Sequence, residues 1–299
     1  MEELSTTHRL AFGIKSKPGV ILVNWKLKCA AFYLLRILPH GAYDLAQKRV
    51  TGRFADMLTD EFLATYMTHV HVFKTLPKGS TAVEFGSGRS LLTPLLLSAA
   101  GANAVLAFDV ARLAIVGRVN DIIGQLRQRG GDWPSITDLN HDLWAKYRIR
   151  YIAPGDVRAT GLDAKSVDFV CSTSTLEHIP PEEVRAILDE CRRICRPGAH
   201  ISMIIDYHDH YATSDPSISR FNFYRYSDAL WRVFSPKEHY QNRLRHSDYE
   251  ALFGDFEIVE NTPIVPSDEI PPIRLARRFR DYSDQDLLAL NGIFTLRNR

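Results

Sequence analysis

The chain has 299 residues, of which 45% are hydrophobic and 24% charged, and its formal net charge is +2. This is an ordinary globular composition, with enough length for a full hydrophobic core. The small net charge gives no reason to expect a polyanionic partner, so we predict no binding to nucleic acid.

The cysteines and the first residues of the sequence indicate the cellular compartment in which the protein is expected. The four cysteines show no paired metal-ligand spacing, so packed and reduced thiols are favoured over a metal site. The acidic start, Met1-Glu2-Glu3, lacks the basic region of a secretory signal peptide. We therefore expect a cytoplasmic protein.

Residues 1–76 are predicted to form an N-terminal helical lid. The expected helices cover Val20–Leu38, Tyr43–Leu58 and Asp60–Leu76. The first helix contains an Asn and several basic residues, so it is not expected to span a membrane. Packing on its own domain is favoured over contact with a membrane surface. Because three helices alone make a small core, we expect the lid to pack over the ligand edge of the following sheet.

Residues 77–299 alternate β-prone and helical segments, which is the pattern of a parallel sheet covered by helices. The expected strands are Thr81–Phe85, Ala104–Phe108, Ile149–Ile152, Val167–Cys171, His200–Ile205, Phe256–Glu260 and Ile293–Leu296. The expected helices lie near Ser90–Ala100, Ala111–Gln128, Pro181–Cys195 and Ser247–Leu252. The predicted fold class is α/β, a Rossmann-like, seven-stranded and mostly parallel sheet flanked by helices.

Two segments are too long for simple connections. Arg129–Lys146 is rich in Trp and polar residues, and Asp206–His246 is rich in aromatic and His residues. Long segments of this kind in compact domains are often functional. We predict that residues 206–246 form a substrate-capping insert, partly helical around Ser227–Phe234.

The first expected strand runs into a glycine turn, Val83–Ser90. Its spacing is Glu-x-Gly-x-Gly, formed by Glu84, Gly86 and Gly88, with Ser90 where a third glycine might stand. A strand, a glycine turn and a helix together suit a nucleotide-type ligand. Taken alone, the turn is equally consistent with a tight connection, and it is not the dinucleotide pattern Gly-x-Gly-x-x-Gly.

Polar residues follow three further strands. Asp109 lies 21 residues after Gly88, where a carboxylate can hold a ribose diol; a helix N-cap is the alternative. Asp156 could accept from an adenine amine or form an Asx turn. The segment Ser172–Ile179 follows the fourth strand at the edge where open α/β sheets bind ligands.

In this order and spacing, the segments resemble the motifs of class I S-adenosylmethionine-dependent methyltransferases. The likeness covers Thr81 to Ile205 and includes Arg196-Pro197-Gly198-Ala199, which resembles a turn before the fifth strand. Ser90 and Ala199 replace glycines of the family pattern, and both are small. The resemblance assigns the following residues to the cofactor: Glu84, Gly86, Ser87, Gly88, Asp109, Asp156, Val157 and Ser174.

The resemblance implies methyl transfer from S-adenosyl-L-methionine to a small-molecule acceptor, with S-adenosyl-L-homocysteine as product. Oxygen is favoured slightly over nitrogen or carbon as the acceptor atom. Asp206–His210 and Asn242–Arg245 carry a weaker likeness to methyltransferases of cell-surface sugar and natural-product pathways. The alternatives are intramolecular cyclisation of the same cofactor, a nicotinamide dehydrogenase, and a non-catalytic module with this fold. Glu84 inside the glycine turn argues against the dehydrogenase.

A hydroxyl nucleophile needs a base, and histidines follow the fifth strand. We predict His208, and then His210, as base or substrate orienter, with Asp206 in the same catalytic group. In an extended segment the two histidines would point to opposite sides. A metal on these three residues is considered, but the carboxylate set is thin and none is predicted. Glu177-His178 is interpreted as a loop-orienting pair.

The insert supplies the predicted substrate contacts. Tyr207, Tyr211, Tyr224 and Trp231 could line a substrate pocket, although aromatic residues at such positions more often pack a core.

Overall fold

The computed structural model describes residues 23–35, 58–265 and 273–299. Most of the predicted helix Tyr43–Leu58 lies outside these ranges. No helix within them is long and apolar enough to cross a membrane.

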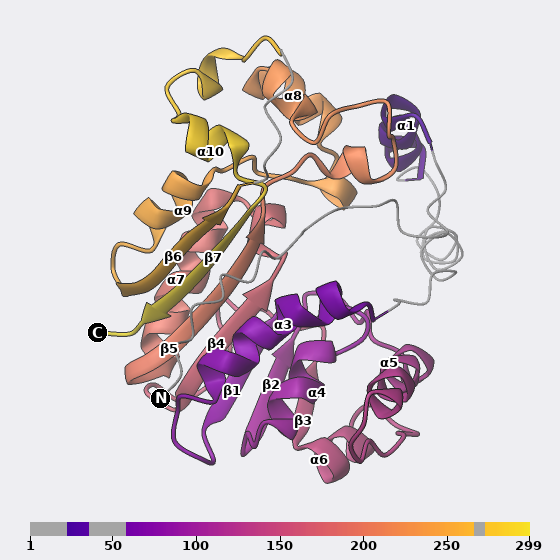
Figure 1. The fold of residues 1–299 in the computed structure, drawn as a ribbon, viewed down its shortest axis with the longest axis vertical. Helices are drawn as coiled ribbons and strands as arrows, with labels where there is room; N and C mark the ends of the chain where they lie inside the picture. Colours follow the sequence, from indigo (N-terminus) through magenta and orange to yellow (C-terminus); the bar gives the residue numbers. More distant parts are fainter. Residues whose placement is uncertain (1–22, 36–57, 266–272) are drawn as a thin grey trace, which may run out of the picture.

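Seven strands of the described residues form one sheet in the order β3-β2-β1-β4-β5-β7-β6 (Figure 1). The strands are β1 (Thr81–Phe85), β2 (Ala104–Phe108), β3 (Ile149–Ile152), β4 (Val167–Thr173), β5 (Cys195–Asp206), β6 (Glu257–Ile264) and β7 (Asn291–Arg297). β1 to β5 pair in parallel, whereas β7 runs antiparallel between β5 and β6. The predicted seven-stranded, mostly parallel sheet is confirmed.

Helices cover both faces of the sheet, and the buried residues of β1 and β4 accordingly point alternately into two cores. One core joins the sheet to α3 (Asp60–Phe73), α4 (Leu92–Ala99), α5 (Val116–Gln128) and α6 (His141–Tyr147). The other core joins it to α7 (Pro181–Ile194) and α9 (His246–Leu252). Ala82 belongs to the first core and its neighbour Val83 to the second, as two-sided burial requires.

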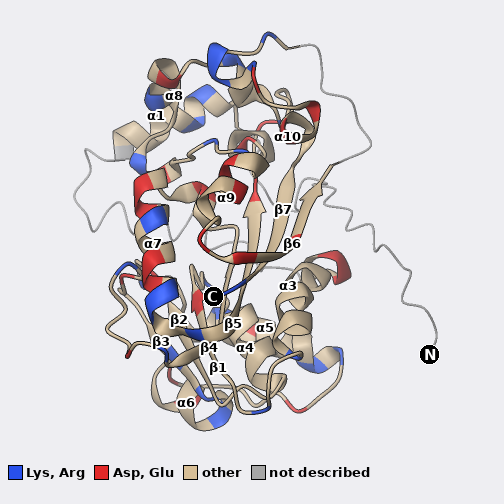
Figure 2. Ribbon diagram, turned by 90° about the vertical axis from the view of Figure 1, so that its left-hand side faces the viewer, with Lys and Arg blue, Asp and Glu red and all other residues tan. Residues whose placement is uncertain are grey.

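The two ends of α7 match the charge pattern in its sequence. Glu182 and Glu183 lie in its first turn, and Arg192 and Arg193 lie in its last turn. Acidic residues near the helix N-terminus and basic residues near the C-terminus offset the helix dipole. In Figure 2, acidic residues (red) and basic residues (blue) are seen along α7.

Two boundaries differ from prediction. The helix expected from Ala111 begins only at Val116, so Asp109 does not cap it. β5 begins at Cys195, which places the predicted turn Arg196–Ala199 inside the strand. Val167 pairs with Cys195 and Phe169 with His200, so the extra residues form an irregularity in the β4–β5 pairing.

A third hydrophobic core lies above the sheet in Figure 1 and forms a cap. It joins α1 (Trp25–Leu35), α8 (Asp228–Phe234) and residues before and within α10 (Asp284–Leu288). The ring of Trp25 lies 5.5 Å from that of Tyr211 and 4.8 Å from that of Phe234. The N-terminal helix α1 therefore packs on the insert, whereas α3 packs on the sheet.

One buried histidine, which the sequence did not single out, fixes α3 to the sheet. His69 is fully buried, and its Nδ1 lies 2.7 Å from Ser202 Oγ while its Nε2 lies 2.8 Å from Thr173 Oγ1. Burial lowers the pKa of His69 to about 3. The ring is therefore neutral in the folded protein at pH 7.

This histidine gives a prediction for stability against pH. The folded pKa lies below that of an unfolded histidine (about 6.5), so acid protonates the unfolded state first and the folded state loses stability as pH falls below that value. The variant His69→Gln lacks this dependence. We expect its stability deficit relative to wild type to narrow by about 2 kcal/mol between pH 7 and pH 5, as measured by urea unfolding.

The control is His141→Gln, at a histidine whose side chain is 86% exposed. That variant should follow the wild-type curve at every pH. Parallel curves for wild type and His69→Gln would contradict a neutral, buried His69.

Candidate active site

The glycine turn after β1 is held against the end of β2. Gly86 and Gly88 have φ values of +71° and +65°, in the left-handed region that favours glycine. Ser87 donates its backbone N–H to the Phe108 carbonyl at 3.2 Å, and Gly88 donates its own to Asp109 Oδ2 at 2.9 Å. The turn and the acid after β2 are therefore parts of one hydrogen-bonded unit.

Asp109 is buried at the carboxyl end of β2 and accepts a second N–H, from Ala111, at 3.1 Å. Burial raises the pKa of its carboxyl, although the N–H groups of Ala111 and Gly88 oppose that effect. Each carboxylate oxygen accepts one backbone N–H and keeps further lone-pair capacity. Asp109 can therefore accept from a ligand hydroxyl without losing its backbone bonds.

Glu84 is a second buried acid of the same unit, 3% exposed within β1. Burial raises its pKa to about 7, opposed by the hydroxyls of Thr93 and Ser87. Its Oε2 has no hydrogen-bond partner among the described residues. A buried carboxylate with a free oxygen suits a ligand ammonium group, so this unit fits the amino-acid end of S-adenosylmethionine.

The other predicted cofactor residues lie after β3 and β4. Asp156 is half exposed and forms an ion pair with Arg158 at 2.7 Å, and it also forms the predicted Asx turn with the N–H of Arg158. Val157 is buried. Ser174 is exposed at the end of β4 and donates its N–H to the Ile204 carbonyl at 2.8 Å. An adenine contact from Asp156 stays a prediction, because Arg158 already binds its carboxylate.

The predicted catalytic residues meet at the end of β5. His208 Nδ1 contacts Asp206 Oδ1 in a short hydrogen bond, and His210 Nε2 lies 3.7 Å from Asp206 Oδ2. The expectation of opposite sides is wrong, because the chain turns at Asp209 into a short 3-10 helix, His210–Thr213, and is not extended. Burial would raise the pKa of Asp206, but His208 and His210 outweigh it and lower that pKa.

A second pair of side chains reaches the same place from β4. The 3-10 turn Leu176–His178 follows the strand, and the His178 ring lies 4.8 Å from the His210 ring. His178 donates from Nδ1 to the Tyr240 carbonyl at 2.9 Å. Glu177 is 2% exposed, and neither of its carboxylate oxygens has a hydrogen-bond partner among the described residues. Burial, and then the charge of Asp206, raise the pKa of Glu177 well above its usual value.

The four aromatic residues predicted to bind substrate are buried, and their polar atoms have protein partners. Tyr211 and Tyr224 donate their hydroxyls to the carbonyls of Phe234 and Leu287, each at 2.7 Å. Trp231 donates to the Gln241 carbonyl at 3.0 Å, and the Tyr207 hydroxyl lies 3.1 Å from His246 Nδ1. They pack the cap and its junction with the sheet, and a substrate contact from any of them stays a prediction.

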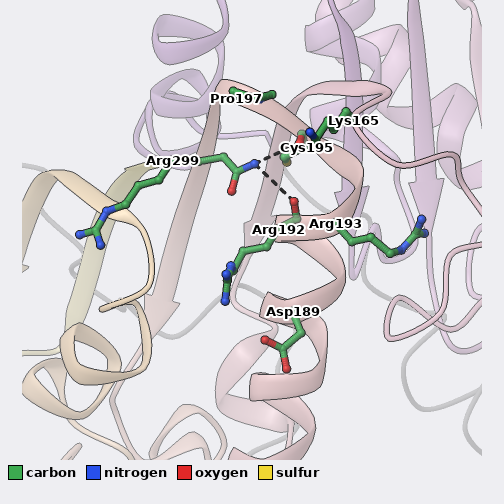
Figure 3. Close-up of a pocket in the computed structure, with 8 residues that line it drawn as sticks. Lys165, Asp189, Arg192, Arg193, Cys195, Pro197 and Arg299 are labelled. Atoms are coloured by element: carbon green, nitrogen blue, oxygen red, sulfur yellow. Dashed lines mark hydrogen bonds between the residues drawn. The ribbon is translucent and has the colours of Figure 1, made fainter.

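A pocket of about 380 Å³ opens elsewhere, at the opposite end of the strands (Figure 3). Lys165 before β4, Cys195 at the start of β5 and Arg299 after β7 are among its lining residues. The predicted cofactor and catalytic residues lie at or after the carboxyl ends of β1 to β5. The pocket in Figure 3 is therefore not part of the candidate active site.

The fold is a Rossmann-like sheet, and the predicted cofactor residues at its edge combine a glycine turn with two buried acids. The strand order extends the Rossmann order 3-2-1-4-5-6 by one antiparallel strand, β7, inserted beside β5. In such sheets, ligands bind outside the carboxyl ends of the strands, which is where the predicted residues lie.

Comparison with known proteins agrees with this class. Residues 135–203 match the family model described as a methyltransferase domain. With the ordered motifs and the strand order, this match identifies the chain as a class I S-adenosylmethionine-dependent methyltransferase, with S-adenosyl-L-methionine as its cofactor. No curated protein matches the chain significantly.

Several solved structures are similar to the chain in fold. The N-methyltransferase NodS from Bradyrhizobium japonicum, in complex with S-adenosyl-L-homocysteine, is 14% identical; the alignment covers 85% of this chain and 97% of NodS, with a TM-score of 0.46. A methyltransferase from Methanosarcina mazei is 14% identical over 77% of this chain and 96% of its own, with a TM-score of 0.46. Geranyl diphosphate methyltransferase is 11% identical over 79% of each chain, with a TM-score of 0.47. These identities say nothing about the acceptor of this chain.

The glycine turn gives a prediction with a matched control. At Gly86 an added Cβ would lie 2.1 Å from Thr175 Oγ1, whereas at Gly79, where φ is +83°, it would meet nothing within 4 Å. Gly79→Ala should cost about 1–2 kcal/mol of unfolding free energy from backbone strain alone. Gly86→Ala should cost about 1–3 kcal/mol more, because Thr175 must move.

Urea unfolding measures both variants. Adding Thr175→Ala to Gly86→Ala removes two of the three crowding atoms and should restore part of the loss. Equal losses for Gly79→Ala and Gly86→Ala would contradict the close approach of the turn to Thr175.

Asp109 gives a second prediction. Asp109→Asn keeps the side-chain volume but removes the charge, so a charge-assisted hydrogen bond to a ribose hydroxyl is lost. We expect the calorimetric affinity for S-adenosylmethionine to fall about ten-fold or more (~1.5–3 kcal/mol). Asp121→Asn, at an exposed acid of α5, should bind as wild type does. An unchanged affinity in Asp109→Asn would remove the ribose assignment.

Proposed function

We propose that the chain transfers a methyl group from S-adenosylmethionine to a hydroxyl oxygen of a small-molecule acceptor, with His208 as the base. The Asp206–His208 pair at the end of β5 is the observation that carries the proposal. A hydroxyl is a weak nucleophile until its proton is removed, whereas a neutral amine can attack without a base. The pair therefore favours oxygen over nitrogen.

The residues of the chain divide the work as follows. Glu84, the Gly86–Gly88 turn and Asp109 hold the cofactor, which when bound supplies an electrophilic methyl group. Asp206 accepts from His208 Nδ1, and this fixes the tautomer in which Nε2 is free to take a proton. His208 Nε2 has only a long contact, 3.4 Å, to Thr213 Oγ1.

The surroundings of the pair support a small acceptor. His208 is 7% exposed, and the cap with its own hydrophobic core stands over this edge of the sheet. We accordingly propose that α1, within the residues 1–76 predicted as a lid, covers this edge, whereas α3 packs on the face of the sheet. Residues 77–299 are then the methyltransferase domain with its capping insert. Acceptors from cell-surface sugar or natural-product biosynthesis fit this proposal. We also propose a cytoplasmic location for the protein, because its four cysteines are buried and free.

A screen with labelled cofactor tests the proposal. The purified chain is incubated with small-molecule extracts and S-adenosylmethionine labelled on its methyl group, and the products are analysed by mass spectrometry. We expect a labelled product with the mass of one added methyl group, attached to oxygen. Consumption of the cofactor without methyl gain by any acceptor would instead indicate intramolecular cyclisation.

The base assignment gives a further prediction. His208→Gln should lower kcat for methyl transfer to oxygen by about 10²–10⁴-fold, because no group then takes the hydroxyl proton. The affinity for S-adenosylmethionine should stay at the wild-type value, since the glycine turn is untouched. His141→Gln serves as control and should change neither quantity. A wild-type kcat in His208→Gln would exclude this residue as the base.

A further inference from the structure

Glu177, His178, Asp206, His208 and His210 bring their polar atoms together from two strand ends. One ligand atom each of Glu177, His178 and His210 lies within 4.8 Å of the other two, and the same holds for Asp206, His208 and His210. The two groups share His210. The sequence offered only the second group, because nothing in it places the 3-10 turn after β4 beside the segment after β5.

The carboxylate of Glu177 is the observation that needs an explanation. It is 2% exposed, and both oxygens lack a hydrogen-bond partner among the described residues. A buried carboxyl group without partners is costly, so a partner that the chain itself does not provide is expected. The rings of His178 and His210 each have a nitrogen within 4.8 Å of a Glu177 oxygen and could share such a partner.

Both rings present a nitrogen suited to a metal ion. His178 donates from Nδ1 to the Tyr240 carbonyl, and this leaves the lone pair on Nε2. His210 Nε2 has no hydrogen-bond partner among the described residues and lies 3.7 Å from Asp206 Oδ2. A ligating histidine held through its other nitrogen by a carbonyl is the usual arrangement in metal sites.

Asn242 holds the turn that carries two of these residues. Its side-chain amide donates to the carbonyls of Leu176 and Ile179 at 2.8 and 2.9 Å, and its backbone N–H donates to the Glu177 carbonyl at 2.9 Å. The carboxylate is therefore positioned before any ligand arrives. Sites with this degree of support hold their ligands in a defined geometry.

We propose that Glu177, His178 and His210 bind one divalent first-row transition-metal ion, with Asp206 beside His210 as a further carboxylate. Two imidazoles and one carboxylate are a ligand set for iron, manganese, cobalt or zinc that leaves coordination positions open. His178 lies at the solvent-exposed side of the group, so an open position there can take an oxygen atom of the acceptor. A hydroxyl bound to the ion would lose its proton to His208 more readily. This role of the ion rests on the proposed function, whereas binding of the ion does not.

Metal binding is measured without acceptor or cofactor. Full-length protein, stripped with a chelator, is titrated with Mn²⁺ and the free ion is followed by electron paramagnetic resonance; Co²⁺ is titrated separately and followed by its visible absorption. We expect one ion per chain. Glu177→Gln and His210→Gln should each weaken binding by at least ten-fold, and circular dichroism verifies that both variants are folded.

Two controls separate this site from other binding. His141→Gln removes an exposed histidine of α6 and should bind both ions as wild type does. Asn242→Asp should weaken Mn²⁺ binding in a folded protein, because the turn loses its amide donor. The proposal is overturned if no saturable binding of Mn²⁺ or Co²⁺ occurs, or if Glu177→Gln and His210→Gln both bind like wild type.

Failure here and failure of the proposed function give different results. If the stripped protein methylates its acceptor at the full rate and binds neither ion, the metal site is wrong and the proposed function stands. If one ion binds through Glu177 and His210 but no acceptor gains a methyl group, the metal site stands and the proposed function fails.

Discussion

The parallel pairing of β4 with β5 is the constraint on which the site depends. Thr173 pairs with Ile204, and Ser174 donates its N–H to the Ile204 carbonyl at 2.8 Å, so both strands end at the same edge. The turn after β4 and the segment after β5 consequently leave the sheet side by side. The candidate base and the candidate metal ligands come from these two exits alone.

The carboxyl groups at this edge of the sheet differ in their hydrogen-bond partners, and their pKa values differ accordingly. Asp109 accepts hydrogen bonds from two backbone N–H groups, and Asp206 is hydrogen-bonded to His208. Each of these two carboxylates therefore has hydrogen-bond partners within the protein. Glu84 and Glu177 each keep unpartnered oxygens, and burial raises the pKa of both. A low-dielectric site penalises an unpaired charge, which makes these two the positions where a cationic ligand contributes most.

A buried arginine, Arg245, links the segment around α10 to the end of β5. The fully buried guanidinium of Arg245 donates to the carbonyl of Tyr207, directly after β5, and to the carbonyls of Asp286 and Ala289, in and directly after α10. Arg243 donates to Phe223 and Tyr226 within the insert. Each of these bonds gives a backbone carbonyl a donor that the surrounding aromatic side chains cannot supply.

The sequence by itself determined the strands of the sheet and the candidate cofactor residues at its edge. Strand-forming segments, the Glu84–Gly88 turn and Asp109 are local patterns, and β1, β2 and β3 have the predicted bounds because short buried strands between turn signals leave little freedom. Only the tertiary structure decided what depends on distant contacts. It decided that His69 bonds to β4 and β5, that α1 packs on the insert, and that Glu177 meets His210 across two strand exits. The spacing between Glu177 and His210 does not by itself show that their loops become neighbours, because strand register and sheet order set that distance.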